Sequence, residues 1–216
     1  MNKPVFLFFI LALQMISKNN PIKHLKKDQV LKKAIEQIGV LEPIKRSSLF
    51  MSLLRAIVSQ QLSVKAADSI WQRFLGLFND GVPQAKSILK LKDERLRAVG
   101  LSYQKASYIK NIAAFSIEQT LDDKLMALKT DDELIEYLVQ IKGVGRWTVE
   151  MLLMFNLNRH DVFPKDDLGI QNGIKKLYKL RSEKKALLKE MESIAEKWRP
   201  YRTLACRYIW RYKDVV

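Results

Sequence analysis

The chain is poor in residues that bind metals or form disulfides. It has one cysteine, Cys206, and two histidines, His24 and His160, which stand far apart. A single cysteine excludes an intrachain disulfide, a zinc site built from cysteines and an iron–sulfur cluster. The sequence therefore predicts no metal site built from side chains, and a reducing, cytoplasmic location.

No apolar run is long enough to cross a bilayer, which takes about 20 residues. The longest run, residues 5–13, continues through Met15 and Ile16 after one glutamine. It has the length of a signal-peptide core, but residues 17–20 contain no small-x-small cleavage site. A targeting signal, a buried or interfacial helix and a start codon placed too early all stay open. We treat residues 1–21 as an apolar extension and residues 22–216 as one domain, with no membrane partner.

Acidic residues are scarce relative to basic ones. The chain has 38 Lys and Arg against 23 Asp and Glu, a formal net charge of +15. Such an excess favours a polyanionic partner, because each neutralised phosphate releases a counterion. A solvated basic surface is the alternative interpretation of the charge alone.

Alternating strand patterns are absent, and the pattern of apolar residues is helical. Leu49, Leu53, Ala56 and Ile57 follow the spacing of an amphipathic helix. Asp131 or Asp132 can cap the helix that begins there. The fold class is therefore all-α. The helices are expected at 26–38, 47–59, 64–77, 92–99, 103–119, 132–141, 146–155, 168–178, 182–197 and 199–212.

A turn with two glycines, Ile141-Lys-Gly-Val-Gly-Arg146, separates two of these helices. Gly143 and Gly145 can adopt backbone angles closed to other residues. Without side chains there, a DNA phosphate can approach the backbone N–H groups at the start of the next helix. Lys142 and Arg146 flank the turn as further phosphate contacts. A plain turn between helices would use the same glycines for geometry alone.

The apolar residues Leu138, Ile141 and Val144 complete a helix–hairpin–helix pattern. Three further segments occur with it: Ala56-Ile-Val-Ser-Gln-Gln-Leu-Ser63, Asp161-Val-Phe-Pro-Lys-Asp-Asp167 and the stretch from Trp198 to Trp210. In this order, the motifs resemble those of the helix–hairpin–helix (HhH-GPD) superfamily of DNA glycosylases, and most of all its 3-methyladenine DNA glycosylase II branch. The resemblance covers roughly residues 22–212, and the spacing from Trp147 to Asp167 also matches.

This resemblance implies a two-lobed helical core with the active-site cleft between the lobes. It also implies a function: a DNA N-glycosylase of base excision repair that flips out alkylated purines, of the 3-methyladenine and 7-methylguanine type, and excises them by hydrolysis. The expected partner is double-stranded DNA containing alkylated bases. A non-catalytic helix–hairpin–helix DNA-binding module is the alternative function. The protein is expected to be a monomer, associated with the nucleoid if bacterial.

Asp167 aligns with the catalytic carboxylate of the resembled family. A fixed carboxylate stabilises the positive charge that builds on the sugar, and it can orient or deprotonate the attacking water. Asp166 or Asp167 could instead simply cap the helix that starts near Leu168, since Asp is a preferred N-cap residue. One aspartate could also cap while the other reacts.

Trp147, Met151 and Trp210 correspond to positions that line the base pocket in the resembled branch. An aromatic face stacks well on a methylated, positively charged purine. Met151 replaces an aromatic residue of a related enzyme, which leaves the preferred lesion open. Ordinary core packing is the other interpretation of both tryptophans. Family members that also cleave the strand carry a lysine at the position of Trp147, so no lyase activity is expected here.

The wedge that fills the gap left by the flipped base is expected at Gln61 or Leu62. Both follow Gln60 at the end of a helix, where a plain polar helix terminus is the other interpretation. The family implies no required cofactor. It does imply a structural monovalent cation held by backbone carbonyls of the hairpin. The hairpin residues expected to contact DNA are Lys142, Gly143, Val144, Gly145 and Arg146.

Overall fold

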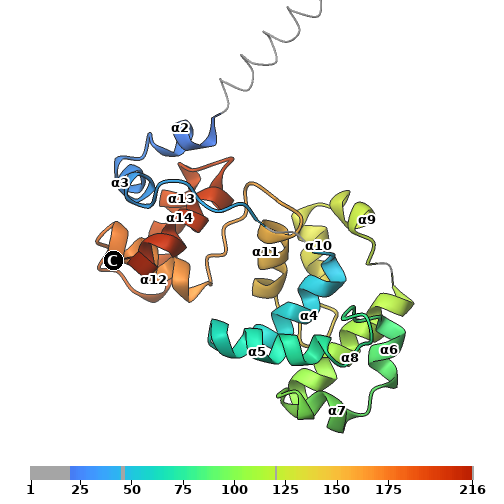
Figure 1. Ribbon diagram of the computed structural model, residues 1–216. Coiled ribbons are helices and arrows are strands. Elements are labelled where there is room, and N and C mark those ends of the chain that lie inside the picture. The colour runs from blue at the N-terminus through green and yellow to red at the C-terminus, as the bar shows by residue number, and fades with distance from the viewer. Residues whose placement is uncertain (1–19, 45–46, 120, 216) are drawn as a thin grey trace, which may run out of the picture. The chain divides into compact units, whose positions relative to one another are not determined.

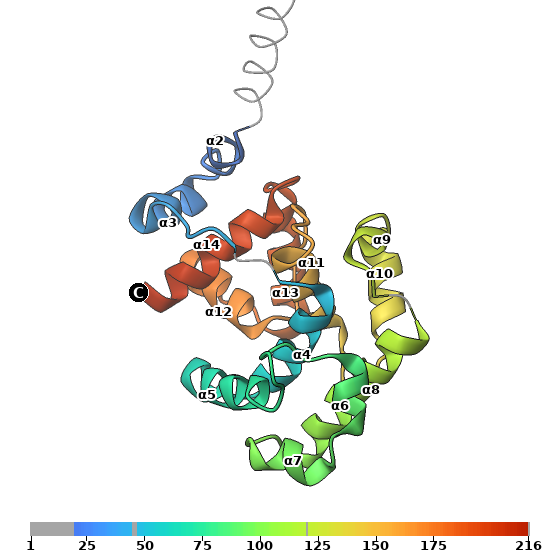
Figure 2. The ribbon, with the colours of Figure 1, turned by 45° about the vertical axis from the view of Figure 1, so that its right-hand side comes forward.

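The computed structural model describes residues 20–44, 47–119 and 121–215. These residues form thirteen α-helices and no strand (Figures 1 and 2), which confirms the all-α fold class. Within the same ranges, no helix combines the length and the apolar content needed to cross a membrane. Of the expected N-terminal extension, residues 1–19 lie outside the described part.

The chain divides into two compact units. The central unit runs from Ile44 to Arg159. The terminal unit combines the described residues up to Pro43 with those from His160 onward.

The central unit is built around α4, which packs against α5, α8 and α11. Leu49, Leu53 and Ile57 are fully buried on one side of α4, as their spacing predicts. The short helices α6 and α7 cover α8. The helices are α4 (Leu49–Ser59), α5 (Val64–Leu75), α6 (Ala85–Lys90), α7 (Asp93–Ala98), α8 (Tyr103–Glu118), α9 (Asp123–Ala127), α10 (Asp131–Leu138) and α11 (Arg146–Phe155).

The cap of α10 differs from the one expected. Thr130, rather than Asp131 or Asp132, is the N-cap, and its hydroxyl accepts a hydrogen bond from the amide of Glu133. The Glu133 carboxylate in turn accepts a hydrogen bond from the amide of Thr130 at 2.7 Å. This reciprocal capping box satisfies two backbone donors, and the two aspartates lie in the first turn, where they favour the helix dipole.

In the terminal unit, α14 packs against α12 and α3, and α12 also contacts α13. Leu31, Ile174 and Ile209 meet in this core with no exposed surface. The helix expected at 26–38 is shorter than expected: α3 begins at Gln29, because Asp28 is its N-cap, and the unexpected helix α2 ends before this range, at Leu25. The helices are α2 (Pro21–Leu25), α3 (Gln29–Ile38), α12 (Leu168–Leu177), α13 (Lys184–Glu196) and α14 (Arg202–Val215).

Asp28 ties three parts of the terminal unit together. Its carboxylate accepts hydrogen bonds from the Tyr178 hydroxyl at 2.6 Å, the Trp198 indole at 3.2 Å and the amides of Val30 and Leu31. Burial alone would raise the pKa of the Asp28 carboxyl, but these hydrogen bonds outweigh it and the pKa is lowered. The charged form is therefore the one that holds α3 against the ends of α12 and α13.

Asp28→Asn is expected to lower the free energy of unfolding by about 2 kcal/mol at pH 7, the scale of hydrogen bonds to a charged group. Because the folded state lowers the pKa, this stability is present above the ordinary value of 3.8 and is lost as the pH falls through the folded value. Urea unfolding of both proteins at pH 7 and pH 3 should therefore show a smaller difference at pH 3. Equal differences at both values would contradict the role of the charge. Glu36→Gln, which breaks an exposed pair with Lys26, is the control and should change little.

Candidate active site and nucleic-acid interface

Residues 139–145 join α10 to α11 in a tight turn. Gly143 has a φ of 106°, a conformation that L side chains rarely adopt. Gly145 is the N-cap of α11 with a φ of −97° and a ψ of 169°, which is ordinary extended backbone. The unusual backbone angles expected at both glycines therefore occur at Gly143 only.

Helix α8 and the end of α4 hold the hairpin in place. A Cβ at Gly143 would lie within 2.7 Å of three atoms of the Tyr108 side chain, so this glycine packs directly on the ring. Asn111 donates a hydrogen bond to the carbonyl of Lys142 at 3.2 Å. Gln60 donates one to the carbonyl of Gly143 at 3.3 Å. These contacts fix the turn from both sides.

The hairpin presents positive charge and backbone donors to solvent. Lys142 and Arg146 are exposed, and no side chain caps the first N–H groups of α11. The Arg146 guanidinium pairs with the buried carboxylate of Glu150 at 3.0 Å, which fixes the arginine beside the helix start. The Val144 side chain is buried, so this residue can meet DNA only through its backbone.

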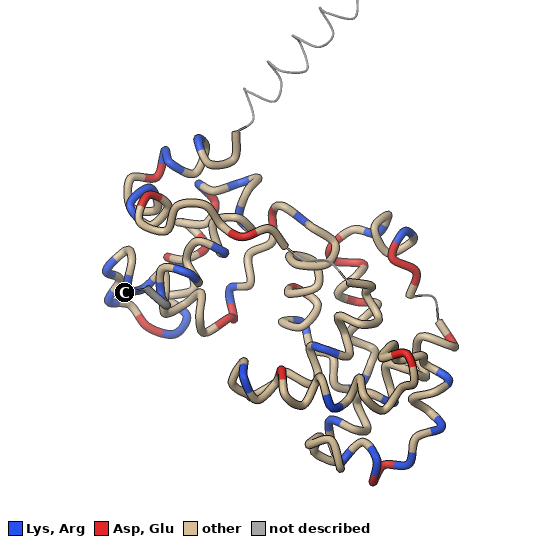
Figure 3. The backbone as a smooth tube through the Cα atoms, in the orientation of Figure 1, with Lys and Arg blue, Asp and Glu red and all other residues tan. Residues whose placement is uncertain are grey.

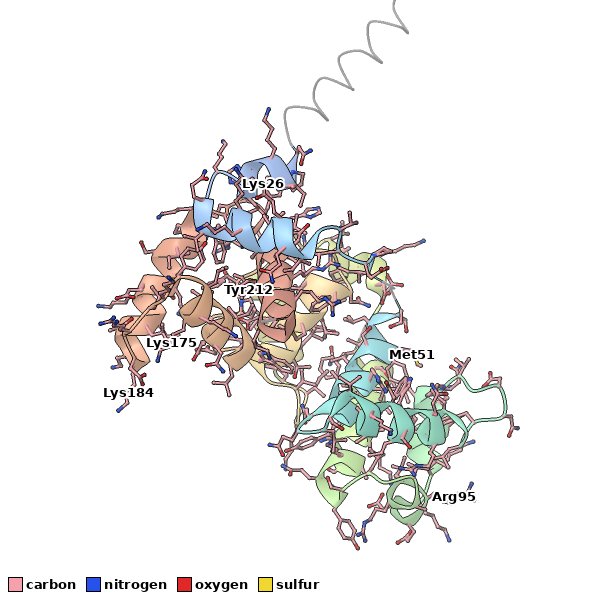
Figure 4. All side chains as sticks on the ribbon, turned by 60° about the vertical axis from the view of Figure 1, so that its left-hand side comes forward. Lys26, Met51, Arg95, Lys175, Lys184 and Tyr212 are labelled. Atoms are coloured by element: carbon pink, nitrogen blue, oxygen red, sulfur yellow. The ribbon has the colours of Figure 1, made fainter. Side chains whose placement is uncertain are left out.

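Basic side chains are not confined to the hairpin. Lys and Arg are distributed along both units (Figure 3). Arg95 in the central unit and Lys184 in the terminal unit are both exposed and point into solvent (Figure 4). The net charge of +15 therefore favours a polyanionic partner over the whole surface and not at the hairpin alone.

Trp147 and Met151 lie one turn apart in α11, directly after the hairpin. Trp147 keeps 43% of its surface exposed, which is unusual for tryptophan in a folded core. Met151 is half-buried. The interpretation of Trp147 as an ordinary core residue is therefore weakened, and part of its side chain is exposed beside the hairpin.

The turn between α4 and α5 carries Gln61 and Leu62. Gln61 has a φ of 55° and is exposed, and Leu62 keeps 39% of its surface exposed. The Lys105 ammonium donates hydrogen bonds to the carbonyls of Val58 at 2.9 Å and Gln60 at 2.6 Å. Burial lowers the pKa of Lys105. The lysine thus fixes the end of α4, where a positive charge also favours the helix dipole.

Asp167 is the N-cap of α12 in the terminal unit. Its Oδ1 accepts a hydrogen bond from the Ile170 amide at 2.7 Å and another from the Trp210 indole at 2.9 Å. The cap and the expected catalytic role therefore fall on the same residue rather than on two neighbours. Asp166 is exposed, whereas Asp167 is partly buried. Two donors on one oxygen restrict the rotation of the carboxylate.

The segment that leads to Asp167 is fastened to the start of α14. Asp161 pairs with Arg202 at 2.8 Å, and the amide of Val162 donates a hydrogen bond to the Thr203 hydroxyl at 3.0 Å. The amide of Asp167 donates to the carbonyl of Pro164. Helix α14 therefore holds the segment that leads to Asp167 at its start and also carries Trp210, the hydrogen-bond donor to Asp167.

The structure thus gathers the expected site residues into two groups. The central unit holds the hairpin, Trp147, Met151, Gln61 and Leu62, and the terminal unit holds Asp167 and Trp210. No sequence pattern predicted the supporting roles of Lys105, Tyr108 and Gly169. Among the described residues, no cluster of His, Cys, Asp or Glu could hold a metal ion.

The chain is similar in sequence to known DNA repair proteins. The family model described as HhH-GPD superfamily base excision DNA repair protein matches residues 54–200. DNA-3-methyladenine glycosylase 1 of Schizosaccharomyces pombe is 40% identical over 191 residues, which are 85% of this chain and 82% of that protein.

Two solved structures are similar over most of the chain. One is the S. pombe 3-methyladenine DNA glycosylase in complex with abasic DNA, with a TM-score of 0.80 and 38% identity over 89% of this chain and 96% of that chain. The other is a DNA-3-methyladenine glycosidase from Bacillus halodurans, with a TM-score of 0.79 and 33% identity over 90% and 89% of the two chains.

Proposed function

Because the chain belongs to the HhH-GPD superfamily of base excision DNA repair proteins, we propose that it is a DNA glycosylase that removes alkylated purines from double-stranded DNA by hydrolysis. The observation that carries this function is the carboxylate of Asp167, capped onto α12 and hydrogen-bonded to the Trp210 indole. Relatives named 3-methyladenine DNA glycosylases support the choice of alkylated purines.

DNA binds at the hairpin. A backbone phosphate approaches the N–H groups at the start of α11, where Gly145 carries no side chain, and Lys142 and Arg146 add positive charge. The buried Glu150 orients Arg146 without removing it from the surface. Such contacts position the duplex without reading its sequence, as a repair enzyme requires.

The target base leaves the helix, and the turn between α4 and α5 provides the wedge. Gln61 and Leu62 are both exposed there, and either side chain can fill the gap in the base stack. The hydrogen bond from Gln60 to the carbonyl of Gly143 joins this turn to the hairpin. The turn that provides the wedge and the hairpin that binds the phosphate are therefore held together within the central unit.

Aromatic side chains recognise the flipped base. The exposed ring of Trp147 stacks on a methylated purine, whose positive charge strengthens the interaction, and Met151 borders it. Within the terminal unit, the indole N–H of Trp210 is directed to the Asp167 carboxylate, so any stacking by Trp210 uses the face of its ring. A methylated, cationic purine is a good leaving group, and stacking without many hydrogen bonds can select it.

Asp167 acts on the sugar. As the bond between C1′ and the purine nitrogen breaks, its electron pair leaves with the base and positive charge develops on the deoxyribose. The Asp167 carboxylate stabilises that charge and accepts a proton from the water that attacks C1′. A methylated purine that is cationic in DNA becomes neutral when it takes this electron pair and leaves as the free base. The other product is an abasic site in an unbroken strand.

Strand cleavage is not part of the reaction, because Trp147 offers no amine for a Schiff base with the sugar. Methylated duplex DNA incubated with the protein should show strand breaks only after alkali treatment, and borohydride should trap no covalent complex. Breaks without alkali, or a trapped complex, would show lyase activity and contradict this point. Binding without any alkali-sensitive sites would indicate the non-catalytic DNA-binding module instead.

A monovalent cation fits the hairpin but takes no part in the chemistry. The carbonyls of Lys142 and Gly143 accept hydrogen bonds from Asn111 and Gln60, and each carbonyl oxygen has a second lone pair for a cation. No other cofactor is proposed. All proposed site residues belong to one chain, so a monomer suffices. The single cysteine, Cys206, is free and buried, which suits a reducing, cytoplasmic location.

A further inference from the structure

Gly169 is the second residue of α12, two positions after Asp167. Its φ lies outside the left-handed region, so the backbone does not require glycine here. Glycine inside a helix is less favourable than alanine, because it loses more backbone freedom on folding. The residue therefore lowers the intrinsic stability of α12 without a local conformational reason.

The surroundings of Gly169 supply the reason. A Cβ at this position would lie 2.9 Å from Oδ1 of Asp167 and 3.0 Å from both Cδ1 and Nε1 of Trp210. Carbon atoms in contact are ordinarily about 3.5–4.0 Å apart, so even a methyl group must displace one of these partners. Neither is loose, because Oδ1 also accepts the Ile170 amide and Trp210 belongs to α14, which packs along α12 (Figures 1 and 2).

Gly173, one turn further along α12, has a different task. A Cβ there would lie 2.5 Å from Cγ2 of the buried Ile209, so Gly173 serves the close packing of α12 on α14. Gly169 instead faces the two side chains of the proposed site. Gly173 therefore has a packing role, whereas Gly169 has a role in the proposed site.

We propose that Gly169 is a positioning residue for base excision: its missing side chain lets the Trp210 indole reach Oδ1 of Asp167 and so sets the orientation of the carboxylate. This role rests on the proposed function of Asp167. A side chain at position 169 would force the carboxylate and the indole apart while the cap and the helix persist.

Gly169→Ala is expected to lower the single-turnover rate of base release by roughly 10- to 100-fold, the effect of moving a catalytic group by about 1 Å. The dissociation constant for DNA should stay unchanged, because the hairpin is untouched. The melting temperature should fall by no more than a few degrees, because the better helix propensity of alanine offsets part of the cost of the displaced contact. Asn172→Ala, an exposed change in the same helix, is the matched control and should match the wild type in all three measurements. An unchanged rate for Gly169→Ala would overturn the inference.

A double-mutant cycle separates action through Asp167 from a general disturbance. On the residual rate of Asp167→Asn, measured at high enzyme concentration, Gly169→Ala should have little further effect. The same fold-loss in both backgrounds would show that Gly169 does not act through the carboxylate. Trp210→Phe, which keeps a ring but removes the donor, should likewise be less than additive with Gly169→Ala.

The indole N–H resonance of Trp210 gives a readout that does not depend on activity. Assigned by its loss in Trp210→Phe, it should move upfield in Gly169→Ala as the hydrogen bond to Asp167 is lost, and stay in place in Asn172→Ala. An unmoved resonance in Gly169→Ala overturns the inference while leaving the proposed function intact. A wild type that releases no base defeats the proposed function, and with it the catalytic role of Gly169, whatever the resonance does.

Discussion

Asp167→Asn should slow base release by roughly 10²–10³-fold or more, the usual effect of removing a group that stabilises charge in a transition state. The carboxamide has nearly the same shape and can still accept hydrogen bonds from the Ile170 amide and the Trp210 indole through its oxygen. The cap of α12 and the affinity for DNA should therefore survive, and only the negative charge of the carboxylate is lost. Single-turnover kinetics on methylated duplex, with fluorescence anisotropy for DNA affinity, measures both quantities.

Asp166→Asn is the control for this variant. Asp166 is exposed and immediately precedes Asp167, so the two variants change net charge equally. We expect Asp166→Asn to keep base release within a few-fold of the wild type. A severe loss in Asp166→Asn with normal rates in Asp167→Asn would transfer the catalytic role to the neighbour and leave Asp167 as a cap only.

Gly143→Ala should be the most damaging single change in the hairpin. The added Cβ would collide with the Tyr108 side chain, and a φ of 106° is strained for alanine. Backbone strain of about 1–3 kcal/mol and overpacking of similar size together predict a loss of about 2–4 kcal/mol in the free energy of unfolding. DNA affinity should fall with it, because the turn that presents the α11 amides is displaced. Urea unfolding and anisotropy titration check the two effects.

Gly145→Ala offers the contrast within the same turn. No atom lies within 4 Å of a Cβ at this position and its backbone is extended, so the free energy of unfolding should change by no more than about 1 kcal/mol. Its methyl group would nevertheless stand at the proposed phosphate contact at the start of α11, and DNA affinity should fall. Equal destabilisation by both alanines, or unchanged DNA affinity in Gly145→Ala, would contradict the distinction between a structural and a contacting glycine.

Long amphipathic helices were predictable from the sequence because burial imposes their period. Leu49, Leu53 and Ile57 show this in α4, where all three are fully buried. The helices α2, α6 and α9 were not predicted, since five or six residues span less than two turns and give a weak periodic signal. Among the helices of this length, only α7 was predicted, within the range 92–99. The cap at Thr130 was missed in favour of the aspartates that follow it, because several polar residues in a row offer equivalent caps.

The candidate site was predictable only as far as its motifs are local. The spacing of Gly143 and Gly145 correctly predicted the tight turn, and the pair Asp166 and Asp167 correctly predicted a helix start. The supports of these motifs could not be predicted, because Tyr108 reaches Gly143, and Trp210 reaches Asp167, from residues far away in sequence. Such contacts depend on the packing of α8 and α14, which no short pattern encodes.

Chromatographic detection of free base released from methylated duplex DNA by the full chain tests the central claim most directly. We predict that the wild type releases free methylated purine and leaves the strands intact until alkali is added. Binding of the same duplex with no free base released, from a protein shown to be folded, would contradict the claim that this chain is a DNA glycosylase.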